Sequence, residues 1–163
     1  SGLLDSLGLL SSLSAYKHYD FTYLIHPILL FTLVSLQLDD INSYLSSWPF
    51  SKEEKKCISV LHSCIKEPIS MPYFVYRYKE DWAILYHELQ CFLAQERIPY
   101  PVMTLPIQNR KELEIDVATI TKLIPRPKGP WIQQLLEMIE YKVVTHQLVN
   151  NREVLIEFVK TYQ

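Results

Sequence analysis

One short stretch decides how the second half of this chain folds, and it reads Pro125-Arg126-Pro127-Lys128-Gly129-Pro130-Trp131. Pro125 and Pro127 disfavour a helix, because proline lacks a backbone N–H and its ring clashes with the preceding turn. Pro130 instead favours the first position of a helix, where its fixed φ is already suitable and its missing donor is not needed. The stretch therefore predicts a rigid basic loop that leads into a new helix.

The helix after this loop carries an apolar stripe with the 3.6-residue period of an α-helix. We predict that it extends through Gln147, with Trp131 as a core anchor and not a ligand contact. The rest of the chain must supply a surface for the stripe. Its apolar positions are Ile132, Leu135, Leu136, Met138, Ile139, Val143 and Val144.

The totals describe a globular protein of one or two domains. The chain has 163 residues, of which 48% are hydrophobic and 21% charged, and this balance excludes a disordered protein. Three glycines against ten prolines disfavour glycine-rich phosphate loops and favour helices separated by proline-bearing connections. We expect an all-α fold, an irregular array of helices without a significant sheet. Residues 1–98 are predicted to form a helical body region and residues 99–163 a helical tail region.

Local signals place the helices of the first region. Ser51 and Glu54 have the spacing of a capping box, which predicts the best-defined helix there. Residues 71–79 remain open between a helix and an extended connector. The other predicted helices are residues 3–14, a helix through about Leu36 that follows the aromatic run 16–23 and has a kink or a delayed start at Pro27, a short helix capped by Asp39 or Asp40, and residues 81–95.

In the second region the sequence predicts two helices besides the one at residue 130. Leu113, Ile115 and Val117 alternate like a strand, but a single strand has no partner, so we interpret them as a loop or helix entry. A short helix then ends near Ile124. The last helix is expected to be capped by Asn150 or Asn151. Its inward residues are predicted to be Val154, Leu155, Phe158 and Val159.

Charge and cysteine usage limit the partners and the compartment. The net charge is −2, but residues 1–96 carry −4 and residues 97–163 carry +2, a weak indication of a polyanionic partner for the second half. Three scattered cysteines favour buried thiols in a reducing, cytoplasmic compartment. The sequence has no apolar run long enough to span a membrane and no leader pattern. It also has no initiator Met, so we expect a piece of a longer protein.

The residues provide no catalytic or metal centre. Asp39-Asp40 is interpreted as a helix cap instead of a metal pair, because adjacent residues point apart on a helix. The five histidines share no short window and are interpreted as structural or surface groups; they are His18, His26, His62, His87 and His146. The segment 73–79 alternates tyrosines with cations, as a base-stacking surface does, although a helix-packing seam is favoured.

The loop at 125–131 is the best candidate for a binding site. Arg126 and Lys128 lie beside the free N–H groups expected at the start of the Pro130 helix, and helix N-termini attract anions. At this level a phosphate seat and a solvated loop are equally favoured.

Several motifs resemble the C-terminal region of bacterial CCA-adding enzymes, the class II tRNA nucleotidyltransferases of the poly(A) polymerase family. The resemblance is strongest from Leu105 to Glu153 and vague over residues 21–100. The residues that carry it are Gly2 to Leu7, Leu105-Pro106-Ile107, Glu112-Leu113, Pro125 to Ile132, Glu140 to Val144 and Leu148 to Glu153.

The resemblance implies a body-and-tail part that grips the acceptor and TΨC arms of tRNA without reading sequence. The catalytic head and the nucleotide-selecting neck, whose motifs this chain lacks, would bind Mg²⁺ with CTP or ATP, so no catalytic, metal or cofactor residue is expected here. The implied partners are tRNA and the protein's own head and neck, with a homodimer as a further candidate. The expected RNA-binding residues are Arg110, Lys111, Lys122, Arg126, Lys128, Gly129 and Pro130.

One element departs from the family pattern. Val117 and Thr119 stand where the family has a glycine and an acid, so a left-handed turn is disfavoured there and Thr119 is left to replace the acid as a helix cap. Two alternatives from other classes remain. One is an all-helical protein-interaction domain whose Tyr and Trp surfaces bind a partner helix, and the other is a metal-dependent helical hydrolase.

Overall fold

The computed structural model describes residues 13–24, 26–78 and 80–162. In these residues the chain forms helices joined by loops and no strand, which confirms the predicted all-α fold. The chain divides into two compact units, the first made of Ser1–Ile69 and Lys79–Pro101 and the second of Ser70–Tyr78 and Val102–Gln163. None of the helices in the described ranges is long and apolar enough to cross a membrane.

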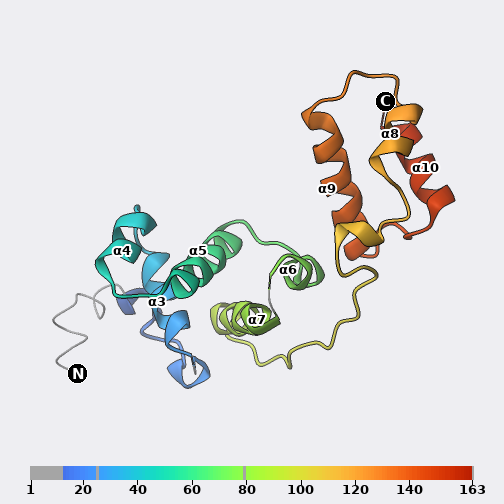
Figure 1. Ribbon diagram of the computed structural model, residues 1–163. Coiled ribbons are helices and arrows are strands. Elements are labelled where there is room, and N and C mark those ends of the chain that lie inside the picture. The colour runs from blue at the N-terminus through green and yellow to red at the C-terminus, as the bar shows by residue number, and fades with distance from the viewer. Residues whose placement is uncertain (1–12, 25, 79, 163) are drawn as a thin grey trace. The chain divides into compact units, whose positions relative to one another are not determined.

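The first unit is built on three packed helices. Helix α3 (Pro27–Ser35) packs against α5 (Lys52–Lys66), and α5 packs against α7 (Glu80–Ala94). Helix α4 (Ile41–Ser47) joins α3 to α5 (Figure 1). Two short 3-10 helices, Ser14–Tyr16 and Phe21–Tyr23, precede α3. The aromatic rings of this leading segment surround Phe92 of α7, with the Tyr19 ring centroid 5.1 Å from that of Phe92.

The aromatic run at residues 16–23 lies before the predicted helix and includes a 3-10 helix and turns. The Asp20 carboxylate accepts hydrogen bonds from the N–H and the hydroxyl of Thr22, which stabilises a turn there. The α-helix begins only at Pro27, with the His26 ring accepting from the Ile28 N–H as a cap. The delayed start at the proline is therefore confirmed. Most of the helix predicted at residues 3–14 lies outside the described residues.

The predicted caps of α4 and α5 are confirmed. The Asp40 carboxylate accepts from the N–H groups of Asn42 and Ser43, at 2.9 and 3.2 Å. The Ser51 hydroxyl accepts from the Glu54 N–H, while the Glu54 carboxylate accepts from the Ser51 N–H at 2.8 Å. These hydrogen bonds satisfy donors that the first helical turn leaves unpaired, so the sequence signals fixed both helix starts.

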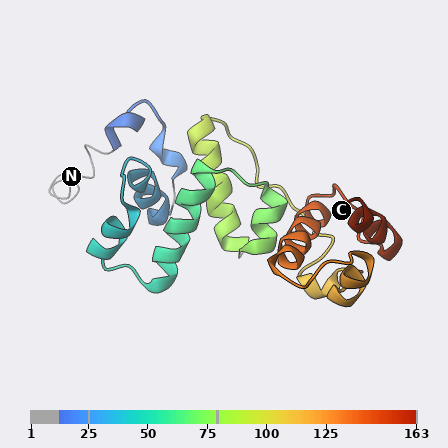
Figure 2. The same ribbon diagram turned by 90° about the horizontal axis from the view of Figure 1, so that it is seen from above.

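The second unit surrounds α9 (Pro130–Val144). Helix α8 (Val117–Leu123) packs against α10 (Arg152–Thr161), and α6 (Met71–Arg77) packs against α9 (Figures 1 and 2). A short 3-10 helix η3 (Arg110–Glu112) precedes α8. Trp131 is buried, as predicted, and so are all stripe positions of α9 except Met138. The core of this unit is completed by Ile107, Leu113, Ile115, Ile120, Ile124, Leu155 and Val159.

Two details of α9 and α10 differ from the prediction. Helix α9 ends at Val144, not Gln147, because His146 adopts a left-handed φ of 58° and the N–H groups of His146 and Gln147 bond back to Val143 and Lys142. Such a turn closes a helix without glycine or proline, so the sequence gives no signal for it. In α10, Leu155 and Val159 are buried and Phe158 packs against the same core, as predicted, but Val154 is 39% exposed.

Residues 71–77, left open by the sequence, form helix α6, and a buried carboxylate links this helix to α9. The Tyr76 hydroxyl donates to Glu140 Oε1 at 2.6 Å, and Arg110 forms an ion pair with Oε2 of the same carboxylate. Glu140 is only 4% exposed. The compact units therefore place residues 70–78 with the second unit, whereas the division into residues 1–98 and 99–163 remains a prediction.

A second buried polar contact joins α3 to α5 in the first unit. The Ser35 hydroxyl donates to the Thr32 carbonyl at 2.6 Å and lies 3.0 Å from His62 Nδ1. Because the only hydroxyl proton is already used, Nδ1–H of a neutral His62 must be the donor to Ser35. Burial, with a smaller effect of Lys66, lowers the pKa of His62 below its ordinary value.

We predict that His62 makes the stability of the chain depend on pH. Its folded-state pKa is lowered, so the unfolded chain takes up the proton first and the free energy of unfolding falls as pH drops below about 6.5. The slope approaches about 1.4 kcal/mol per pH unit until the folded-state pKa is reached. Urea unfolding of the wild type and His62→Asn, measured by circular dichroism at several pH values, checks this.

His18, which is exposed, provides the control. The His18→Asn variant should keep the slope of the wild type, and His62→Asn should reduce it. Equal slopes for His62→Asn and the wild type contradict the assignment.

We also predict that Arg110 stabilises the second unit. Arg110→Ala leaves a buried carboxylate with one hydrogen bond fewer and no cation, so the free energy of unfolding should fall by about 1–3 kcal/mol. Adding Glu140→Gln removes the unpaired charge and should restore much of that loss. The neighbouring, exposed Lys111→Ala is the control and should stay within about 0.5 kcal/mol of the wild type. A loss for Arg110→Ala no larger than for Lys111→Ala refutes the role.

Candidate nucleic-acid interface

The loop before α9 is held by the first aromatic residue of the helix. Trp131 Nε1 donates to the Pro127 carbonyl at 2.7 Å, so the indole closes the loop onto the first helical turn. Pro130 occupies the first helical position, as predicted. Gly129 is the N-cap residue, and no side chain caps the helix. Pro130 has no N–H and the Ile132 N–H donates to the Gly129 carbonyl at 3.2 Å, so the Trp131 N–H is the donor at this helix start that a capping side chain or an anion could take.

Arg126 packs at the same place. Its guanidinium carbon lies 5.9 Å from the centroid of the Trp131 ring, within the range of a cation–π contact. Arg126 and Trp131 line a pocket of about 260 Å³ together with Ile124, Pro125 and Tyr162. The pocket thus joins the end of α8, the loop, the first turn of α9 and the end of α10.

Four of the predicted RNA-binding cations are exposed to solvent: Lys111, Lys122, Arg126 and Lys128. Lys122 lies in the last turn of α8, and Arg126 and Lys128 follow it in the loop. Within the described part of the chain, the recorded ion pairs include none of these four. Their charges are thus available to a polyanion. Gly129 and Pro130 form the backbone at the helix start itself.

Arg110 differs from the other predicted cations. It contacts the buried Glu140 and donates to Gln133 Oε1 at 2.9 Å, and its side chain is 36% exposed. The carboxylate raises the pKa of Arg110, since their hydrogen bond favours the charged form. Arg110 therefore has a structural partner inside the unit, which a pattern of charges along the sequence does not reveal.

The element that departs from the family pattern has an ordinary helical geometry. The cap of α8 is Asp116, whose carboxylate accepts from the Thr119 N–H at 2.8 Å, so the partial replacement expected of Thr119 is not needed for this helix. The pKa of Asp116 is lowered by hydrogen bonds from Thr119, mainly from its side chain and secondly from its backbone N–H. Val117 is the first residue of the helix, and no left-handed residue is needed there.

The sequence gives no indication of the position of Tyr162 or of the partners of Asn150, whereas the predicted cap of α10 is Asn151. Tyr162 lines the pocket although 31 or more positions separate it from the other four lining residues, and no periodic signal links them. Asn150 accepts from the Glu114 N–H at 3.0 Å and donates to the Glu112 carbonyl at 2.8 Å, which fastens the loop after α9 to η3. An asparagine side chain that both donates to and accepts from the backbone is typical of a supported loop. The sequence does not show which backbone groups it bonds.

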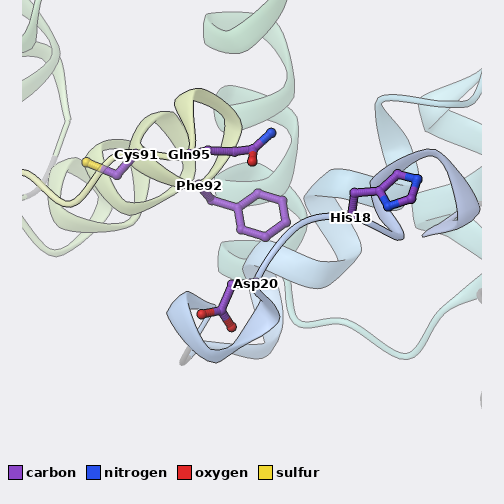
Figure 3. A pocket seen from close by; sticks show the side chains of 5 residues that line it. All are labelled: His18, Asp20, Cys91, Phe92 and Gln95. Atoms are coloured by element: carbon purple, nitrogen blue, oxygen red, sulfur yellow. The ribbon is translucent and has the colours of Figure 1, made fainter.

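The hydrolase alternative depends on polar groups that the fold does not bring together. The first unit has a small pocket of about 150 Å³ with His18, Asp20 and Cys91 among its lining residues. Figure 3 shows Phe92 in the middle of these groups, and the Cys91 sulfur points away from His18 and Asp20. Among the residues that can be described, no group of three or more His, Cys, Asp or Glu side chains is arranged to hold a metal ion.

The tyrosines of α6 are used in packing. Tyr73 and Tyr76 lie partly buried against the core of the second unit, and the ring centroids of Tyr73 and Tyr141 are 5.0 Å apart. Arg77 lies over the Tyr73 ring, 5.8 Å from its centroid. These contacts agree with the helix-packing seam that the sequence favoured over a base-stacking surface.

Comparison with known proteins confirms the resemblance found in the sequence. The family model for tRNA nucleotidyltransferase domain 2 matches residues 27–159. A CCA-adding enzyme of Enterococcus faecalis is 30% identical over 139 residues, which cover 81% of this chain and 34% of the relative. A CCA-adding enzyme of Oceanobacillus iheyensis is 46% identical over 57 residues, which cover 34% of this chain and 14% of the relative.

A solved structure shares the fold. The crystal structure of the Bacillus stearothermophilus CCA-adding enzyme in complex with CTP matches with a TM-score of 0.69 at 14% identity, covering 95% of this chain and 42% of that one. The chain thus spans less than half the length of each of these three proteins. With a family model that matches residues 27–159 of 163, the chain belongs to the tRNA nucleotidyltransferase domain 2 family.

Proposed function

We propose that this chain is the tRNA-holding body and tail of a CCA-adding tRNA nucleotidyltransferase. The observation that carries the proposal is the family match over residues 27–159, combined with exposed cations around an uncapped helix start. The relatives that share this region are CCA-adding enzymes. In this proposal the chain grips the acceptor and TΨC arms, while a head and neck outside the chain bind Mg²⁺ and CTP or ATP and extend the tRNA 3′ end.

The chemistry at the α9 start suits phosphates. Lys122, Arg126 and Lys128 supply charge, and the start of α9 adds the Trp131 N–H, which no side chain at Gly129 caps, together with the positive end of the helix dipole. Contacts of this kind position a nucleic acid without reading its bases. This fits an enzyme that has to accept many tRNAs, because all of them share the backbone.

The charge distribution also supports this surface. Residues 97–163 carry a net charge of +2, whereas residues 1–96 carry −4. In the second unit the acidic groups Glu140 and Glu157 are paired with Arg110 and Lys160. The remaining cations of the α8–α9 loop then set the local potential that a polyanion meets.

We predict that Arg126→Ala with Lys128→Ala weakens tRNA binding without unfolding the chain. Each lost phosphate contact should lower the slope of log Kd against log salt by about one, so the double variant should lose about two. Filter binding or fluorescence anisotropy with a tRNA transcript, repeated over a salt series, measures both the affinity and the slope.

Lys52→Ala with Lys55→Ala is the matched control, because it removes the same charge from α5 in the first unit. It should leave the salt slope near that of the wild type. A wild-type affinity that does not respond to salt contradicts tRNA binding and favours the protein-interaction alternative. A tRNA affinity that depends on salt but is equal in the wild type and the Arg126/Lys128 variant places the phosphate contacts elsewhere.

The helix start can be tested separately through Gly129. Its φ of −173° is extended backbone that any residue adopts, and a Cβ there would meet its nearest atom, Trp131 Cδ1, at an ordinary 3.5 Å. Gly129→Asp should therefore fold and cap α9. Its carboxylate would take the Trp131 N–H and repel a phosphate, so tRNA affinity should fall roughly two- to five-fold.

Gly129→Ser supplies the neutral comparison, because serine also caps the helix but adds no charge. We expect the loss of affinity to be smaller for serine than for aspartate, and to shrink for aspartate as salt increases. If both variants bind tRNA as tightly as the wild type, the start of α9 is not a phosphate seat.

A further inference from the structure

We propose that the pocket between α8, the 125–130 loop and α10 receives one unstacked nucleobase of the bound RNA. The pocket is lined by Ile124, Pro125, Arg126, Trp131 and Tyr162 and measures about 260 Å³. This inference rests on the proposed function and adds to it, because phosphate contacts alone need no pocket. It assigns the second unit a contact with a base as well as with the backbone.

The lining has the composition that holds an unpaired base. Aromatic rings and arginine guanidinium planes are the groups on which splayed-out bases stack. Here Tyr162 supplies the ring on which a base can stack, and Arg126 supplies the guanidinium; the Trp131 indole, whose centroid lies 5.9 Å from the guanidinium carbon, is a buried wall behind them. Apolar Ile124 and Pro125 complete the walls, and none of the five lining residues is acidic. The surface is thus both apolar and positively charged, a combination that suits a base attached to a phosphate.

The Trp131 wall of the pocket is ordered by contacts within the protein. The Trp131 indole is held by its hydrogen bond to the Pro127 carbonyl, and its side chain is only 8% exposed. Pro125 and Pro127 precede and follow Arg126 in the sequence, and both restrict the backbone there. Figure 1 shows that the C-terminal end of α10, which carries Tyr162, lies at the same end of the second unit as the loop. A pocket wall that is ordered before binding lowers the conformational entropy lost when a ligand binds.

Size and position indicate a base and not a larger group. Pockets for drug-sized ligands measure roughly 300–1,000 Å³, so one of about 260 Å³ suits a single ring system. Trp131 is the second residue of α9, so its indole in the pocket wall and its uncapped backbone N–H at the helix start belong to the same residue. One nucleotide can therefore place its phosphate at the helix start and its base, or a neighbouring base, in the pocket.

The first test separates base contact from phosphate contact with two Tyr162 variants and two RNAs. Tyr162→Leu keeps apolar packing but removes the ring, and Tyr162→Phe keeps the ring. The probes are a tRNA transcript, which has unpaired loop bases, and a blunt-ended RNA duplex with the same number of phosphates. Tyr162→Leu should lose about five-fold or more in tRNA affinity and stay near the wild type on the duplex, while Tyr162→Phe stays near the wild type on both.

The outcomes separate the two levels of the proposal. If the wild type binds neither RNA, the proposed function itself fails. If it binds tRNA and Tyr162→Leu binds equally well, the base pocket is refuted and the phosphate contacts remain. Equal losses of Tyr162→Leu on tRNA and on the duplex also refute the pocket, because the duplex offers no unstacked base.

A second measurement does not depend on tRNA affinity. The indole N–H resonance of Trp131, assigned by its absence in Trp131→Phe, is followed by NMR while the chain is titrated with adenosine 5′-monophosphate or with ribose 5-phosphate. The nucleotide should shift this resonance and the sugar phosphate should not. Equal shifts, or none with either compound, overturn the assignment of a base to this pocket.

Discussion

The hydrogen bond from the Trp131 indole to the Pro127 carbonyl is the contact on which the second unit depends. It ties the proline loop to the first turn of α9. The bond therefore also sets the direction in which α9 extends from the loop. The apolar stripe of α9 then faces α6 on one side and the α8–α10 pair on another. The same bond fixes the indole beside Arg126, so one contact orients both the core and the candidate interface.

Much of the fold could be predicted because its signals are local. Asp40, the Ser51–Glu54 pair and Pro130 each act within one helical turn, and the structure places a helix start at all three. The missed features depend on contacts distant in sequence or on turns without a marker residue. The left-handed His146 ends α9 where no glycine signals it, and Asn150 bonds to the backbone of Glu112 and Glu114 across more than 30 positions.

The candidate site was predicted in part, for the same reason. Arg126 and Lys128 were found because prolines and a helix start surround them in the sequence. Tyr162 was not, since a contact across more than 30 positions leaves no periodic trace. Arg110 was predicted as an RNA-binding residue along with Arg126 and Lys128, and here the local pattern is incomplete. By charge it resembles the other cations, but Tyr76 and Arg110 share one buried carboxylate, and only the folded chain shows that this arginine has a partner.

Helix α6 gives the two units a discontinuous architecture. The chain leaves the first unit after residue 69, contributes α6 to the second, returns at residue 79 and crosses again after residue 101. Neither unit is therefore a continuous segment that a single cut can release. A C-terminal piece that starts at residue 102 lacks the helix that covers one face of α9, along with the hydroxyl that binds Glu140. In evolution such an arrangement favours inheritance of the two units together, because a break at any of these boundaries damages at least one of them.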